Sequence, residues 1–135
     1  MSKLSAFLNP VSAEQEREVV ISNRFQDEQG NPVPFRIRAI MQEENDKIVK
    51  SCTRRMKNGE ETVDTRLLSR KLVVAATVEP DFRAKEMCDR YATLDPLEVP
   101  GKMLLVGEYN KLVQAIMELS GLDDTPDEIE DEIKN

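Results

Sequence analysis

The clearest pattern of hydrophobic and polar positions lies between Met103 and Gly121. Its apolar residues recur three and four positions apart and would form one face of an α-helix: Tyr109, Leu112, Val113, Ile116 and Leu119. Glu108 stands in the first turn, where free backbone N–H groups favour a carboxylate, and Gly121 suits the end of a helix. We predict a helix with Ile116 in the core. The apolar run Met103–Val106 before it is also expected to be buried, with a partner-binding ridge as the alternative.

Two alternating segments near the N-terminus predict a β-hairpin. Arg17–Phe25 and Pro34–Ile40 each alternate between apolar and polar residues, and Gly30-Asn31 between them is a turn signal. In the second segment Arg36 and Arg38 share the polar face. An isolated hairpin is marginal in water, so its apolar face must pack on helices or its edges must find further strands.

Helical spacing returns directly after the hairpin. The segment Gln42–Asn58 carries an apolar stripe and favourably ordered charge pairs, and Gly59 is placed to end it. We therefore predict one helix here, followed by a linker at Glu60–Val63.

Three further segments favour helices. The first begins at Asp64 or Thr65 and runs through Val78, with a strand as the alternative at Val73-Val74. Asp81 caps a short helix that reaches Tyr91. Asp95-Pro96 then starts a turn that Pro100-Gly101 cuts short.

Together these elements predict an α+β protein, with a small antiparallel β-hairpin or sheet near the N-terminus followed by a mainly helical bundle. Residues 17–122 form the single domain. Residues 1–16 form an apolar N-terminal arm that docks either on its own core or on a neighbour. Residues 123–135 form an acidic tail, which we expect to be disordered.

The charge of the chain is concentrated at its C-terminal end. The formal net charge is −7, and the residues from Leu122 onward include seven acids against one base, so the rest is nearly neutral. The broad basic surface typical of nucleic-acid-binding proteins is not evident. No apolar run approaches the ~20 residues of a membrane span, and no signal peptide is visible. We expect a cytoplasmic protein that binds neither nucleic acid nor membrane.

The residue types that catalysis needs are scarce. Without histidine, Ser–His and Cys–His nucleophile pairs and His-ligated metal sites are impossible. Cys52 and Cys88 are interpreted as reduced, buried thiols, although a disulfide between them stays open. Gly101-Lys102 lacks the neighbours of a phosphate-binding loop. We therefore expect no enzymatic activity, no metal and no cofactor.

Two stretches carry a family resemblance: Met103-Leu104-Leu105-Val106-Gly107-Glu108-Tyr109, followed by Leu112, Ile116 and Gly121, and Val78-Glu79-Pro80-Asp81-Phe82. They resemble the XkdN-like tail assembly chaperones of long-tailed phages and prophages. The similarity spans about residues 17–122, and Pro100 just before Lys102 departs from the family pattern.

The resemblance implies a non-enzymatic role. Proteins of this family are thought to bind the long, aggregation-prone tape measure protein and to keep it soluble until tail tube subunits polymerise around it. The alternatives are a tail structural or completion protein and, behind it, a small DNA-binding regulator.

The expected partner is therefore an apolar helical segment of the tape measure protein, bound by burial of its apolar face. The candidate surface combines Leu4, Phe7 and Leu8 of the arm with the hairpin, where Arg36 and Arg38 lie. An unpaired strand edge is also a route to self-association.

Overall fold

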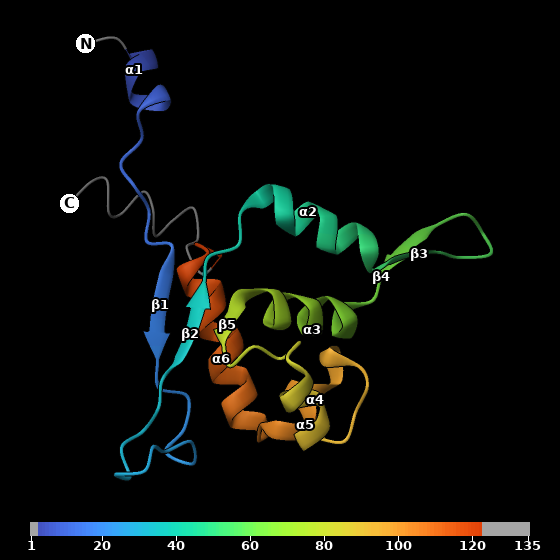
Figure 1. The fold of residues 1–135 in the computed structure, drawn as a ribbon. Coiled ribbons are helices and arrows are strands. Elements are labelled where there is room, and N and C mark those ends of the chain that lie inside the picture. Colours follow the sequence, from blue (N-terminus) through green and yellow to red (C-terminus); the bar gives the residue numbers. More distant parts are fainter. Residues whose placement is uncertain (1–2, 123–135) are drawn as a thin grey trace.

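The computed structural model describes residues 3–122, in which a small antiparallel sheet packs on helices (Figure 1). β1 (Glu16–Val19) and β2 (Phe35–Arg38) form the predicted hairpin, but the first strand ends at Val19 and does not continue to Phe25 as the alternation predicted. β5 (Thr77–Glu79) pairs with the other edge of β2, so the strand order is β1-β2-β5. The class is α+β, as predicted. The acidic tail at 123–135, and the disorder expected of it, lie outside the described residues.

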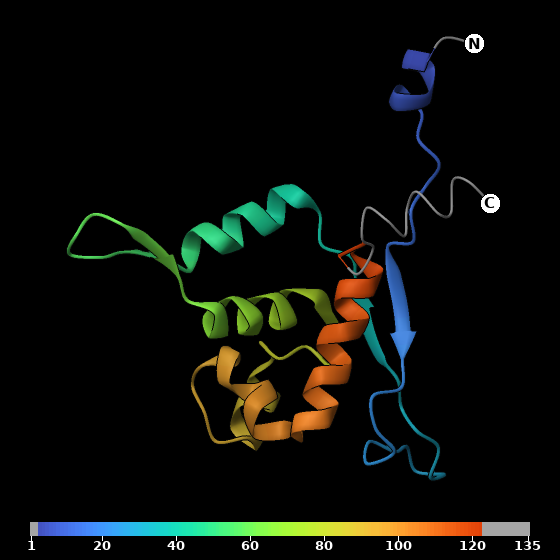
Figure 2. The ribbon, with the colours of Figure 1, turned by 180° about the vertical axis from the view of Figure 1, so that it is seen from behind.

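Helices cover one face of this sheet. The helices of the described residues are α1 (Lys3–Leu8), which lies apart from the sheet, α2 (Gln42–Ser51), α3 (Thr65–Ala76), α4 (Lys85–Arg90), the 3₁₀ turn η1 (Pro96–Glu98), α5 (Val99–Met103) and α6 (Val106–Leu119). A second hairpin joins β3 (Thr53–Arg55) to β4 (Glu61–Val63) and projects from the body (Figure 1). α6 runs alongside the sheet, contacts β1 and β2, and also contacts α3 (Figure 2).

A cluster of aliphatic and aromatic side chains joins the sheet to the helices. The alternation of β2 turns Phe35 and Ile37 into this cluster, and the helical spacing of α6 adds Leu112 and Ile116. Ile116 is 4% exposed, which confirms its predicted place in the core. Both cysteines are buried and free, as expected.

The predicted helix Gln42–Asn58 is wrong beyond Ser51, because the chain there enters the β3–β4 hairpin. Gly59 does not end a helix. With φ at +86° it takes a left-handed position in the hairpin turn, where an Asn-Gly pair is favoured. Glu60–Val63, expected to be a linker, supplies strand β4. β-branched residues on both sides of the turn favour paired strands over a continuing helix.

The predicted helix through Val78 ends earlier, at Ala76. The next three residues form β5, because β-branched Thr77 and Val78 favour an extended backbone and the free edge of β2 offers hydrogen bonds. The start of α3 is as predicted. The Asp64 side chain accepts a hydrogen bond from the Leu67 N–H at 3.1 Å and so caps the helix.

The expectation that Met103–Val106 is buried holds for only half of the run. Met103 and Leu104 pack against the core, whereas Leu105 and Val106 are exposed at the corner where α6 begins. Pro100 does not cut the preceding turn short. It lies in the first turn of α5, where a residue without an N–H leaves no helical hydrogen bond unmade.

An ion pair ties the segment after β1 to the start of α6. Arg24 Nη2 donates to Glu108 Oε1 at 2.5 Å, and its Nε donates to Oε2 at 2.9 Å. The Leu105 N–H also donates to this carboxylate at 2.8 Å and caps the helix. Hydrogen bonds from Arg24, then from the Ser22 hydroxyl and the Leu105 N–H, hold the pKa of Glu108 at about 2, below its ordinary value of 4.5.

We expect Glu108→Gln to lower stability at neutral pH and to match the wild type in strong acid. A carboxyl whose folded-state pKa is depressed stabilises the protein above its unfolded pKa, near 4.5, and this contribution is lost as the pH falls towards about 2. Urea denaturation at a series of pH values measures the difference. Glu43→Gln, which changes an exposed carboxylate on α2, is the control and should follow the wild type. A gap between Glu108→Gln and wild type that stays constant across the series would contradict this account.

Candidate functional site

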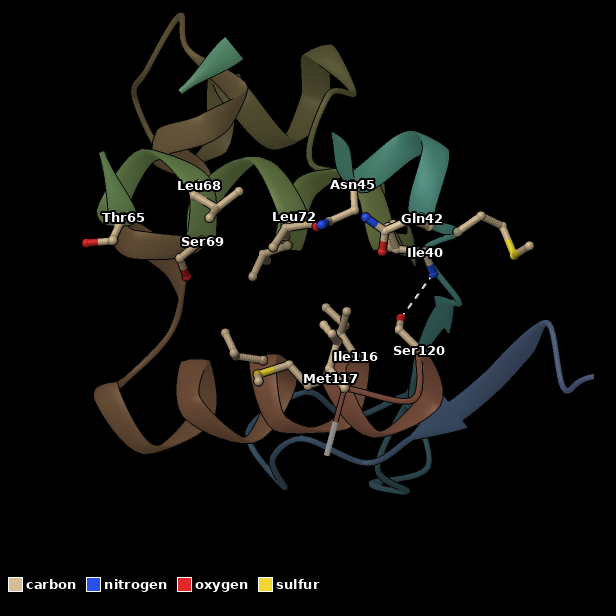
Figure 3. A pocket seen from close by; sticks show the side chains of 14 residues that line it. Ile40, Gln42, Asn45, Thr65, Leu68, Ser69, Leu72, Ile116, Met117 and Ser120 are labelled. Atoms are coloured by element: carbon tan, nitrogen blue, oxygen red, sulfur yellow. Dashed lines mark hydrogen bonds between the residues drawn. The ribbon is translucent and has the colours of Figure 1, made fainter. Parts of the chain in front are cut away.

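An open groove lies between α2, α3 and α6 (Figure 3), with a volume of about 430 Å³. Most of the side chains that line it are aliphatic: Ile40, Met41, Leu68, Leu72, Val73, Val113, Ile116, Met117 and Leu122. Uncharged polar residues complete the lining: Gln42, Asn45, Thr65, Ser69 and Ser120. Figure 3 shows side chains of α3 pointing across the groove towards those of α6.

Helical spacing explains why these side chains meet. Leu68 and Leu72 are four residues apart on α3, and Val113 and Met117 are four residues apart on α6. Each pair therefore forms a stripe along one face of its helix. Because α3 and α6 pack together, the two stripes become opposite walls.

Hydrogen bonds hold the elements that carry the groove. The Ile40 N–H donates to Ser120 Oγ at 3.0 Å, which ties the segment before α2 to the end of α6 (Figure 3). The hydroxyl oxygens of Ser69 and Tyr109 lie 2.7 Å apart and link α3 to α6. The groove is therefore built on fixed elements before any partner arrives.

None of the described residues that line the groove carries a charge, in a chain of which 33% of the residues are charged. An apolar concave surface with a few polar groups suits apolar side chains of a partner. Within residues 3–122, no group of three or more cysteine, aspartate or glutamate side chains is arranged to hold a metal ion. In the same part of the chain no helix has the length and apolar character needed to cross a membrane.

The arm residues predicted to bind a partner lie on α1, which stands apart from the sheet and the other helices in both views (Figures 1 and 2). Leu4, Phe7 and Leu8 are 63%, 80% and 69% exposed. The segment between α1 and β1 contains neither helix nor strand, and Glu16, assigned to the arm from the sequence, is the first residue of β1.

Arg36 and Arg38, the other predicted partner-binding residues, are engaged within the chain. Arg36 pairs with Glu79 at 3.3 Å. Arg38 donates hydrogen bonds of 2.8 and 2.6 Å to Glu44, which hold the pKa of that carboxyl below its ordinary value. These arginines join β2 to β5 and to α2, and the structure does not bring them together with the exposed side chains of α1.

The groove residues are not among those predicted from the sequence. The signal that marks them is the width of the apolar surface on α3. Val73 and Ala76 are buried and account for the contact with the core, whereas Leu68 and Leu72 extend the apolar surface beyond it and stay half-exposed. An apolar stripe wider than the core requires indicates a second contact surface.

Comparison with known proteins identifies the family. The profile described as "Phage XkdN-like tail assembly chaperone protein, TAC" matches residues 4–134. Two proteins of Bacillus subtilis strain 168 are similar over 98% of this chain and 93% of their own length: "Uncharacterized protein YqbN", 36% identical, and "Phage-like element PBSX protein XkdN", 34% identical. A crystal structure of YqbN matches with a TM-score of 0.73 at 35% identity, over 90% of this chain and 98% of that chain. The chain therefore belongs to the family of XkdN-like phage tail assembly chaperones, whose role in tail assembly is of a non-enzymatic kind.

Proposed function

We propose that this protein holds an apolar helical segment of the tape measure protein in the groove between α2, α3 and α6. It keeps this client soluble until tail tube subunits polymerise around it. The observation that carries the proposal is an uncharged, aliphatic groove in a member of a tail assembly chaperone family.

The shape and chemistry of the groove suit a helix. A client helix with apolar side chains at positions i, i+3, i+4 and i+7 buries them between the two apolar stripes of the groove. Leu68 and Leu72 supply one stripe and Val113 and Met117 the other. The unbranched, flexible side chains of Met41 and Met117 adapt to different client sequences. Recognition of this kind tolerates a long client whose apolar segments differ from one another.

The groove, rather than Arg36 and Arg38, is the proposed contact because these arginines already have carboxylate partners inside the chain. Several copies would bind along one tape measure protein. Each contact can then be weak while the assembly as a whole remains bound. Weak single contacts also permit stepwise displacement as the tube grows.

Co-expression with the tape measure protein tests the proposal. The wild type should bring the client into the soluble fraction, and Met117→Glu should leave it in the pellet. A carboxylate placed between aliphatic walls loses water without gaining a partner when the client binds. The measured quantity is the fraction of the client in the supernatant of the lysate.

Leu94→Glu is the matched control. It adds the same charge at a fully exposed position in the loop between α4 and η1 and should retain the client like the wild type. Thermal melting of both variants verifies that each is folded. A client equally insoluble with and without the wild type refutes the chaperone role, whereas a folded Met117→Glu that solubilises the client refutes the groove as its site. Finding the protein in mature tails would favour the structural alternative.

A further inference from the structure

The part of the arm before β1 that the structure describes, residues 3–15, presents an apolar face that no other residue of 3–122 covers in this arrangement. Leu4 and Leu8 are four residues apart, and Phe7 is three from Leu4, so the three side chains share one face of α1. Every residue of α1 is exposed or half-exposed. Contiguous exposed apolar faces of this kind mark interaction surfaces.

The arm and the groove both have few charged residues. From its start to Ala13, the only charged side chain of the arm is Lys3. The described residues that line the groove carry no charge at all. Because a third of the chain is charged, two apolar surfaces with so few charges are unusual in it. Burying Leu4, Phe7 and Leu8 in the groove places no ionised group among its lining residues, and Lys3 at the start of α1 can stay in water.

The C-terminal end of the arm lies beside the groove. The Ala39 N–H donates to the Gln15 carbonyl oxygen at 2.8 Å, and the following residue, Ile40, hydrogen-bonds to Ser120. Ile40 and Ser120 both line the groove. The segment from Asn9 to Gln15 spans at most about 23–25 Å when extended. Two copies related by a two-fold axis near the C-terminal ends of their arms therefore place each arm within reach of the other copy's groove.

We propose that two copies of this chain exchange arms, so that α1 of each copy lies in the α2–α3–α6 groove of the other. The partner is a second copy because α1 points away from its own body in the structure (Figures 1 and 2). A reciprocal exchange closes the assembly at a dimer and covers both apolar arms, whereas a one-way contact would continue into a filament. The arm and the client occupy the same groove, so the exchanged dimer is the form without client, and a bound client displaces the arm.

Oligomeric state in solution, measured by sedimentation velocity over a range of concentrations, gives the first test. The wild type and Leu94→Glu should be dimers. Phe7→Glu in the arm and Met117→Glu in the groove should each weaken dimerisation by about a hundredfold or more, because each seats an unpaired carboxylate in the apolar contact. Met41→Glu, at an exposed position of the groove, repeats the second test without touching the core.

Mixing the two classes of variant provides the decisive test. Phe7→Glu retains an intact groove and Met117→Glu retains an intact arm, so together they form one complete arm–groove contact. Phe7→Glu carrying a C-terminal affinity tag should therefore capture untagged Met117→Glu, although neither captures another copy of itself.

Three results would overturn the proposal. A wild type that stays monomeric at all concentrations excludes the exchange. Groove variants Met117→Glu and Met41→Glu that both dimerise like the wild type show that the arm binds elsewhere. Failure of the mixed pair to associate, with each variant folded by thermal melting, shows that the arm does not bind the groove. None of these results bears on whether the groove binds the tape measure protein, because the co-expression assay reads that separately.

Discussion

Phe82→Ala should lower the free energy of unfolding by about 3–5 kcal/mol. Phe82 lies in the turn between β5 and α4 and is fully buried in the core cluster. Removing its ring takes away the burial of a large apolar side chain and leaves a cavity that the surrounding elements fill only in part. The loss is a large share of the ~5–15 kcal/mol that typically stabilises a domain. Urea denaturation at neutral pH measures it.

Leu94→Ala is the control for this experiment. Leu94 is 98% exposed, and truncating it should change stability by no more than about 0.5 kcal/mol. A loss below about 1 kcal/mol for Phe82→Ala, with the control behaving as expected, would mean that the turn after β5 does not pack into the core in solution.

Ile116→Ala should cost about 2–5 kcal/mol of stability and should also weaken binding in the groove. Ile116 is buried in the core cluster and at the same time lines the groove, so its side chain contacts both surfaces. Truncation removes apolar contacts from the protein interior and from the surface that would meet a bound helix. Urea denaturation measures the first effect, and client retention or dimerisation measures the second.

Leu112→Ala separates the two effects. Leu112 lies one helical turn before Ile116 on α6 and is fully buried, but it is not among the residues that line the groove. It should lose a similar amount of stability and leave binding unchanged under conditions where both variants are folded. A stability change near zero for Ile116→Ala would show that this face of α6 is open to solvent. If the two variants bind the client or a second copy equally well, Ile116 does not contribute to the contact in the groove.

The elements predicted correctly from the sequence are those whose signal is local. The 3.6-residue spacing of Leu112, Ile116 and Leu119 predicts α6, and the alternation of β2 predicts its inward and outward faces. β5 has no such local signal. Its three residues form a strand because they pair with the edge of β2, which lies about forty positions earlier in the chain. The β3–β4 hairpin had a local signal in Asn58-Gly59, but good helix formers around it favoured the wrong interpretation.

The candidate site depends on tertiary placement, which the sequence pattern does not contain. Leu68 and Met117 are 49 positions apart and become opposite walls only when α3 packs on α6. The sequence does show that the arm is apolar, through Leu4, Phe7 and Leu8. The exposure of these side chains in the structure agrees with a surface that meets a partner. The partners of Arg36 and Arg38 follow from strand register and from the position of α2, and neither is visible in a hydropathy pattern.

During synthesis, the N-terminal hairpin emerges well before the elements that cover it. One edge of β2 stays unpaired until β5 is made. The inner face that carries Phe35 and Ile37 stays uncovered until α6 is made, and the last residue of α6 follows about 80 positions after β2. At typical translation rates of about 5–20 residues per second, this interval lasts roughly 4–16 s. An open strand edge and an uncovered apolar face are then both exposed on the nascent chain. A tail assembly chaperone of this fold thus passes through a stage on the ribosome in which its own sheet is open to aggregation.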